Sequence, residues 1–167
     1  MSRPTETSVP YVAAAEFVGA LWRFSADWFV PILNSSRVTL NLSSLFGFLF
    51  GFDKSSFIPI QYYFYMGGTG LGQFSTTPLR GYDDRSVGPR RTTSLASRGG
   101  IIGGRGMIKH SAELRFALAL NPIPIYTLAF AEAGNVWAEP KVMNPMDLKR
   151  SAGLGVRLLI NPIGLIG

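Results

Sequence analysis

One long stretch of alternating side chains constrains the fold of this chain more than any other feature. Between Val38 and Phe52 most even positions carry large apolar side chains, whereas most odd positions are small or polar. A period of two is typical of a β-strand whose two faces contact different media. The stretch is longer than the roughly 5 or 6 residues of an ordinary strand, and no amphipathic helix in the sequence could cover its apolar face. Lipid is the simplest cover, so we predict a membrane-spanning strand.

The same alternation recurs elsewhere and predicts an all-β chain. In the segment 125–133 the pattern is weaker, because Glu132 shares its parity with apolar residues; a bulge or an apolar face that does not contact lipid would explain this. The end of the chain, 163–167, has the pattern of the opening of another strand. The further strands are predicted at 21–30, 111–120, 125–133 and 151–160.

Five strands leave the predicted sheet with two open edges. Unpaired backbone groups in hydrocarbon cost several kcal/mol each, so only closed barrels are stable there. Five strands cannot close a barrel that also holds a long loop. We therefore expect a partial transmembrane antiparallel β-barrel, which is a piece of a larger barrel or pairs with other chains. A soluble β-sandwich is the weaker alternative.

A long glycine-rich loop is predicted at residues 53–100, and it contains the turn Arg80-Gly81-Tyr82. Connections in compact domains are mostly about 4 to 6 residues long, and longer ones are functional or disordered. Glycines such as Gly67 and Gly68 permit positive φ and close backbone approach, so the loop can fold into a tight space. Its glycine spacing matches neither a P-loop nor a dinucleotide fingerprint.

Composition excludes several classes of function. The net charge is +6, but the basic residues are scattered singly apart from Arg90-Arg91 and Lys149-Arg150, so we expect no nucleic-acid binding. The chain has no cysteine and one histidine, His110, which has no metal-ligating neighbours and is expected at the barrel rim. No nucleophile, base and orienting group can be assembled, so we expect no enzyme, no cofactor and no metal site. Glu6 and Glu16 make the N-terminus a poor signal peptide, and residues 1–10 are expected to form a turn or frayed end before one barrel segment, 11–167.

Several ordered motifs carry a resemblance to a known family. The chain resembles the C-terminal barrel of the BamA-type outer-membrane β-barrel assembly factors over about residues 19–167. That resemblance implies a sixteen-stranded barrel preceded by POTRA domains. This chain would contain neither the POTRA domains, nor the first strands of the barrel, nor its last two strands. The motifs are Tyr65-Met66-Gly67-Gly68, Leu79-Arg80-Gly81-Tyr82, Val87-Gly88-Pro89, Ser111-Ala112-Glu113-Leu114-Arg115-Phe116, Phe130-Ala131-Glu132-Ala133-Gly134-Asn135-Val136-Trp137, and Ser151-Ala152-Gly153-Leu154-Gly155-Val156-Arg157 with Asn161-Pro162-Ile163-Gly164.

The resemblance also implies where the loop goes. In this family the Arg-Gly-Phe/Tyr turn sits at the tip of an extracellular loop that folds back into the lumen. Arg80 matches the lumenal arginine, and Glu113 and Glu132 match its acidic partners on the inner wall. Arginine suits such a latch because its planar fork of donors can bind a carboxylate at two points.

The function implied by the resemblance is the assembly and insertion of outer-membrane proteins in the bacterial cell outer membrane. Its implied partners are outer-membrane protein precursors, accessory assembly lipoproteins and the lipid bilayer. The alternative is a pore of the two-partner-secretion type, which exports a soluble passenger and shares this loop. POTRA domains upstream of the barrel discriminate between the two, because several favour insertion and two after a plug helix favour export.

Overall fold

The computed structural model describes most of the segment from residue 19 onward. The expected turn or frayed end at 1–10 lies outside the described residues. Among the described residues, no helix has the length and hydropathy needed to cross a bilayer. The described ranges are 19–32, 37–52, 58–69, 76–90, 100–119, 124–160 and 164–166.

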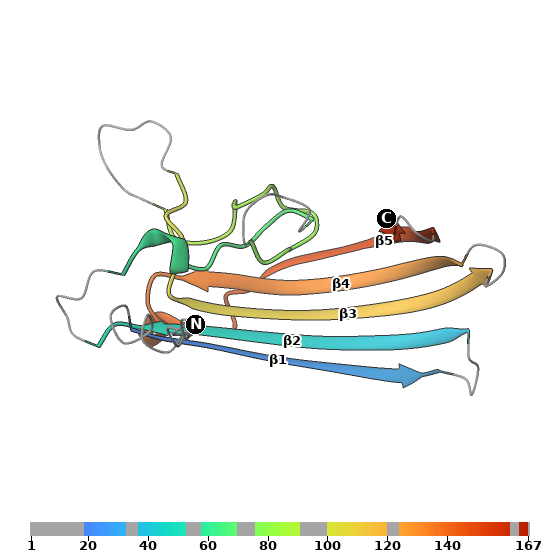
Figure 1. The fold of residues 1–167 in the computed structure, drawn as a ribbon, viewed down its shortest axis with the longest axis horizontal. Helices are drawn as coiled ribbons and strands as arrows, with labels where there is room; N and C mark the ends of the chain where they lie inside the picture. The colour runs from blue at the N-terminus through green and yellow to red at the C-terminus, as the bar shows by residue number, and fades with distance from the viewer. Residues whose placement is uncertain are drawn as a thin grey trace, which may run out of the picture.

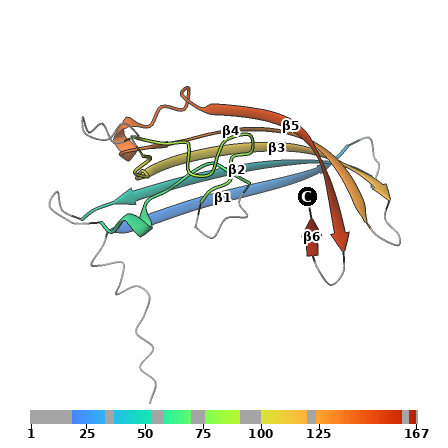
Figure 2. The same ribbon diagram turned by 90° about the horizontal axis from the view of Figure 1, so that it is seen from above.

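The described strands form one antiparallel sheet in which each strand pairs with the next along the chain (Figure 1). This confirms the predicted all-β fold and open sheet, as in part of a β-barrel wall. The sheet is curved, and β5 bends strongly toward its C-terminal end (Figure 2). The predicted opening of a further strand is present as β6. The strands are β1 (Ala20–Pro31), β2 (Val38–Phe50), β3 (Gly106–Ala119), β4 (Ile125–Trp137), β5 (Lys149–Ile160) and β6 (Gly164–Ile166).

Several predicted strand boundaries were wrong. Strand β2 ends at Phe50, and Phe52 lies beyond it. Strand β3 begins at Gly106 rather than at residue 111, because its first residues pair with the end of β4. Strand β4 does not stop before Gly134, where the sequence suggested a turn, but continues to Trp137.

The long loop explains why a glycine occupies position 134 inside a strand. A Cβ at this position would stand 2.7 Å from the sulfur of Met66, so the glycine makes room for a loop side chain above the strand. Gly47 does the same in β2, where a Cβ would stand 2.7 Å from the ring of Phe64. Both glycines therefore let the loop approach the sheet closely, and neither ends a strand.

One face of the sheet, called here the outer face, is apolar and exposed. It carries the even-numbered side chains of β1, β2, β3 and β5 and the odd-numbered side chains of β4, which are matched by the strand register. This confirms the predicted alternation. Its large exposed side chains include Trp22, Phe24, Trp28, Leu42, Leu114, Phe116, Leu118, Leu154 and Val156.

The long loop between β2 and β3 covers part of the opposite face, the inner face, while Leu21 and Phe29 of β1 on this face stay exposed. Figure 1 shows the green and yellow parts of this loop folded back over the sheet. Met66 and Leu79 of the loop are fully buried, with an exposed fraction of 0%, and they pack in one core with side chains of the sheet. That core consists of Leu49, Ile58, Phe64, Met66, Leu79, Val87, Met107 and Val136.

The weak alternation in β4 follows from this arrangement. Leu128, Glu132 and Val136 all lie on the inner face and are buried. The structure therefore supports the second of the two explanations for this segment, an apolar face that does not contact lipid. The register shift between β3 and β4 lies only near Ala117 and Ala119, at the far end of the strands.

Candidate functional site

The loop is tied to the wall of the sheet through Arg80. Its main-chain N–H donates a hydrogen bond of 2.8 Å to Oε2 of Glu132, and its Nε and Nη2 donate bonds of 3.1 and 2.7 Å to Oε1 of the same carboxylate. Backbone and side chain of one residue thus hold both oxygens of one carboxylate. Because three donors converge on a fixed group, the turn can dock in essentially one orientation.

Glu113 on β3 completes the site around Arg80. Its Oε1 lies 2.7 Å from Nη2 of Arg80. The same carboxylate accepts hydrogen bonds from Arg115, at 2.9 and 2.7 Å, and from Arg157 of β5, at 3.2 and 3.1 Å. Glu113 therefore joins the loop to two strands of the wall.

The guanidinium of Arg80 also stacks on the wall. Its Cζ lies 3.7 Å from the centre of the Phe130 ring, a distance at which the cation attracts the ring face. Burial lowers the pKa of Arg80, but the hydrogen bonds and charges of Glu132 and Glu113 together outweigh burial, so the pKa is raised overall. Arg80 therefore stays charged at any physiological pH.

The two residues after Arg80 shape the turn. Gly81 has φ of +85°, a conformation that side chains disfavour, and a Cβ there would meet the side chain of Ser151 at 3.3 Å. The hydroxyl of Tyr82 donates a hydrogen bond of 2.9 Å to the main-chain oxygen of Arg150. Loop and β5 are thus joined beside the carboxylate site.

Gly67 and Gly68 form the other side of this turn. Both have positive φ, at +130° and +71°. The N–H of Gly68 donates to the main-chain oxygen of Tyr82 at 2.9 Å, and the N–H of Leu79 donates to the oxygen of Gly68 at 3.1 Å. A Cβ on Gly67 would stand 2.2 Å from the oxygen of Asp83, so only glycine fits there. The structure therefore brings all seven residues of the predicted site into one assembly.

Sequence reasoning missed the other cations of this cluster. Lys109 lies 3.2 Å from Glu132, and Arg115 and Arg157 bind Glu113. Together with Arg80, four cations surround two carboxylates, so the cluster carries an excess of positive charge. The position of Arg115, two residues after Glu113 on the same strand face, was a signal that could have predicted one of these pairs.

The apolar contacts between loop and sheet were also missed. Thr77 donates a hydrogen bond of 3.1 Å to the sulfur of Met107, beside the buried Met66 and Leu79. The signal was present in the apolar residues at odd positions, such as Leu49 and Met107, which do not fit a purely polar inner wall. The loop is therefore held by a hydrophobic core as well as by its arginine.

One further expectation needs correction. His110 does not lie at the rim but within β3 on the outer face, where its Nδ1 lies 2.9 Å from the hydroxyl of Ser44. The tryptophans differ in their surroundings: Trp137 is buried at the end of β4, whereas Trp22 and Trp28 are exposed. Within the described ranges, no group of three or more histidine or acidic side chains could hold a metal ion.

The curved, open antiparallel sheet, with an apolar outer face and a loop docked on its inner face, defines part of a β-barrel wall. Comparison with known protein families matches residues 20–167 to the Omp85 superfamily domain. The chain therefore belongs to the Omp85 superfamily, whose proteins are associated with outer membranes and act in protein insertion or secretion. No curated protein matches the chain.

Proposed function

We propose that this chain is part of the barrel of a BamA-type assembly factor, which folds and inserts β-barrel proteins into the bacterial cell outer membrane. The observation that carries the proposal is the docking of Arg80 on Glu132 and Glu113, on the inner face of a sheet whose outer face is apolar. The ordered motifs that resemble this family lie at these same positions. The work is non-enzymatic in this proposal: the barrel acts as a template.

The docked loop stabilises one conformation of the wall. Glu132 belongs to β4, Glu113 to β3 and Arg157 to β5, so the cluster joins three strands and the loop. Breaking a buried pair by removing one partner costs about 3 to 5 kcal/mol. We propose that the docked loop keeps the wall rigid while strands elsewhere in the barrel pair with an incoming strand, since strand addition gives affinity without sequence specificity.

The proposed partners follow from this role. Precursors of outer-membrane proteins are the clients, accessory assembly lipoproteins bind outside the barrel, and the bilayer contacts the outer face. Transmembrane barrels of bacteria have short periplasmic turns and longer extracellular loops. By that rule the end of the sheet with the long loop faces the outside of the cell.

The test uses the complete protein reconstituted in lipid vesicles together with an unfolded outer-membrane protein as client. Arg80→Ala should release the loop and lower the rate of client insertion, measured as protease-protected folded client. Arg90→Ala removes an exposed arginine of the same loop and is the matched control. A loop that becomes protease-sensitive while insertion proceeds at the normal rate would contradict the proposed role of the latch.

The same preparation separates insertion from export. If the protein inserts no client but transports a soluble passenger across the vesicle membrane, it is a secretion pore of this superfamily. Arg80→Ala would then change passenger transport instead of client insertion.

A further inference from the structure

The outer face of the sheet has a shallow depression of about 710 Å³. Its floor is made by the alanines of one row across three neighbouring strands, Ala112, Ala131 and Ala152, which are paired in register. Large side chains flank them: Trp28 and Leu42 continue the same row on β1 and β2. The depression therefore exists because the middle of the row lacks side chains beyond Cβ.

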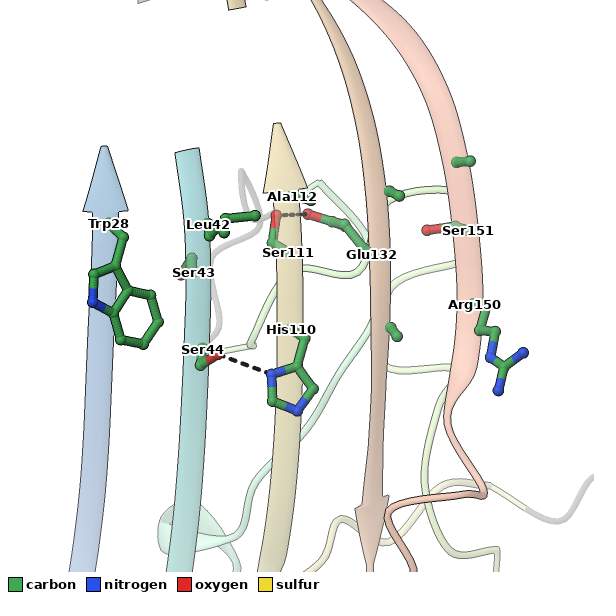
Figure 3. Close-up of a pocket in the computed structure, with 13 residues that line it drawn as sticks. Trp28, Leu42, Ser43, Ser44, His110, Ser111, Ala112, Glu132, Arg150 and Ser151 are labelled. Carbon is green, nitrogen blue, oxygen red and sulfur yellow. Dashed lines mark hydrogen bonds between the residues drawn. The ribbon is translucent and has the colours of Figure 1, made fainter. Parts of the chain in front are cut away.

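Polar groups occur in the next row toward the long-loop end of the sheet. This row consists of Ser44, His110, Ala133 and Arg150, again paired in register. Figure 3 shows the bond between Ser44 and His110 on one side of the depression and Arg150 on the other. The ring of His110 is fixed by this bond and by an edge-to-face contact with the ring of Phe46, with 5.6 Å between the ring centres.

The charge on this face is one-sided. Among the described outer-face residues of β1 to β5, Arg150 is the only charged side chain and no carboxylate occurs. Glu132 also borders the depression, but its carboxylate is bound to Arg80 of the loop, on the inner face. Arg150 is exposed, and no described residue forms an ion pair with it. A cation in apolar surroundings needs an anionic partner from outside the chain, because an unpaired charge beside hydrocarbon is costly.

The position of Arg150 along β5 is the one expected for contact with a lipid headgroup. On β2, apolar outer-face side chains extend beyond this row toward the long-loop end of the sheet, at Phe46, Phe48 and Phe50. On β5 they stop at Ala152, and the next outer-face residue toward that end is Arg150. The edge of the apolar surface therefore lies farther from the long-loop end on β5 than on β2, as expected for strands that are tilted in a bilayer. Arg150 stands at that border, where headgroups meet acyl chains, and the alanine floor extends below it.

From these observations we infer that the depression binds a lipid whose headgroup carries phosphate, in the membrane leaflet on the side of the long loop. The phosphate accepts charge-assisted hydrogen bonds from the guanidinium of Arg150, and the ring of His110 borders the same space. An acyl chain lies over Ala112, Ala131 and Ala152, where its packing fills the gap between larger side chains. The inference rests on the membrane location in the proposed function, and it does not depend on the insertion activity.

The test measures lipid binding to the complete protein, delipidated and folded in a nonionic detergent, by native mass spectrometry. The probes are dioleoylphosphatidic acid and dioleoylphosphatidylcholine, which share their acyl chains. Phosphatidic acid should bind more tightly, and Arg150→Gln should weaken it about ten-fold, as expected for loss of a hydrogen bond to a charged group. Ala131→Phe fills the floor without changing charge and should weaken both lipids.

Two matched controls separate the site from general effects. Lys141→Gln removes an exposed cation from the turn between β4 and β5, and Ala26→Phe adds the same ring to the outer face outside the depression. Neither should change the affinity for phosphatidic acid. Circular dichroism of each variant shows whether the barrel is folded.

Other outcomes overturn the inference. Equal affinity for the two lipids in the unchanged protein and in Arg150→Gln would show that the headgroup is not recognised. Displacement of phosphatidic acid by millimolar inorganic phosphate alone would indicate a soluble ligand, and photo-crosslinking from position 131 in membranes to protein, including a second copy, would indicate a protein-binding surface. Normal lipid binding in a protein that inserts no client would contradict the proposed function and leave the lipid site standing.

Discussion

The two faces of the sheet differ in how their side chains are satisfied. Where the long loop docks on the inner face, charged groups are paired with one another and apolar groups are covered by the loop, as with Arg80 on Glu132 and Met66 in the core. On the outer face, Leu154 is 85% exposed and Arg150 has no ionic partner among the described residues. The part of the inner face under the loop is thus satisfied within the chain, whereas the outer face leaves large apolar side chains without a described cover. The contrast favours the outer face as the one that contacts lipid.

The largest effect is expected from a substitution that disrupts the ion pairs on the inner face. Glu132→Ala removes the carboxylate that binds Arg80 and Lys109, and its side chain is only 3% exposed, so the two cations lose a buried partner. We expect the docked loop to lose about 3 to 5 kcal/mol, measured by hydrogen exchange of the loop amides in the bilayer-embedded protein. Glu139→Ala breaks an exposed pair with Arg105 and should cost no more than about 1 kcal/mol. Equal effects of the two substitutions would contradict the buried latch.

A charge on the outer face should have the next largest effect. Leu154→Arg places a guanidinium near the middle of β5, where it would face acyl chains. We expect a loss of about 2 to 4 kcal/mol in folding free energy in a bilayer, measured by denaturant titration in vesicles. In water such an exposed position tolerates arginine, so an unchanged free energy of folding would refute lipid contact there.

The close contact between loop and sheet predicts a smaller effect. Gly134→Ala puts a methyl group 2.7 Å from the sulfur of Met66 and 3.1 Å from the main-chain oxygen of Ile108. We expect a cost of about 1 to 3 kcal/mol, typical of overpacking, measured as increased protease sensitivity of the loop. Gly155→Ala is the control, because a Cβ there would meet its nearest side chain at an ordinary 3.5 Å.

The smallest expected effect concerns the hydrogen bond between the turn and β5. Tyr82→Phe removes the hydroxyl that donates to the main-chain oxygen of Arg150. We expect a loss of about 0.5 to 1.5 kcal/mol, visible as faster hydrogen exchange of the turn with no change in the barrel strands. Release of the whole loop by this substitution would mean that the carboxylate cluster contributes less than its geometry indicates.

The strand faces could be predicted from sequence because alternation is a local property. Strand ends could not, since Gly134 has a turn-like residue type, yet its strand continues because residues 134–137 pair with the start of β3. The glycine is needed there because Met66 from the distant loop occupies the space above it. The meeting of Arg80 with Glu113 and Glu132 came from resemblance, as no spacing rule relates a loop residue to two strands. Of the additional cations, Lys109 and Arg157 depend on the register between strands, which the sequence does not specify by itself, whereas Arg115 follows Glu113 on the same strand.

The most direct test of the two-face account is a spin-label scan along β5. The chain contains no cysteine, so single cysteines at residues 151–156 can be labelled in the bilayer-embedded protein once cysteines elsewhere in the complete protein are replaced. Collisions with oxygen, which dissolves in lipid, should be frequent at 152, 154 and 156 and rare at 151, 153 and 155. High accessibility of the even positions to a water-soluble nickel complex, or low accessibility of all six positions to both reagents, would contradict the account.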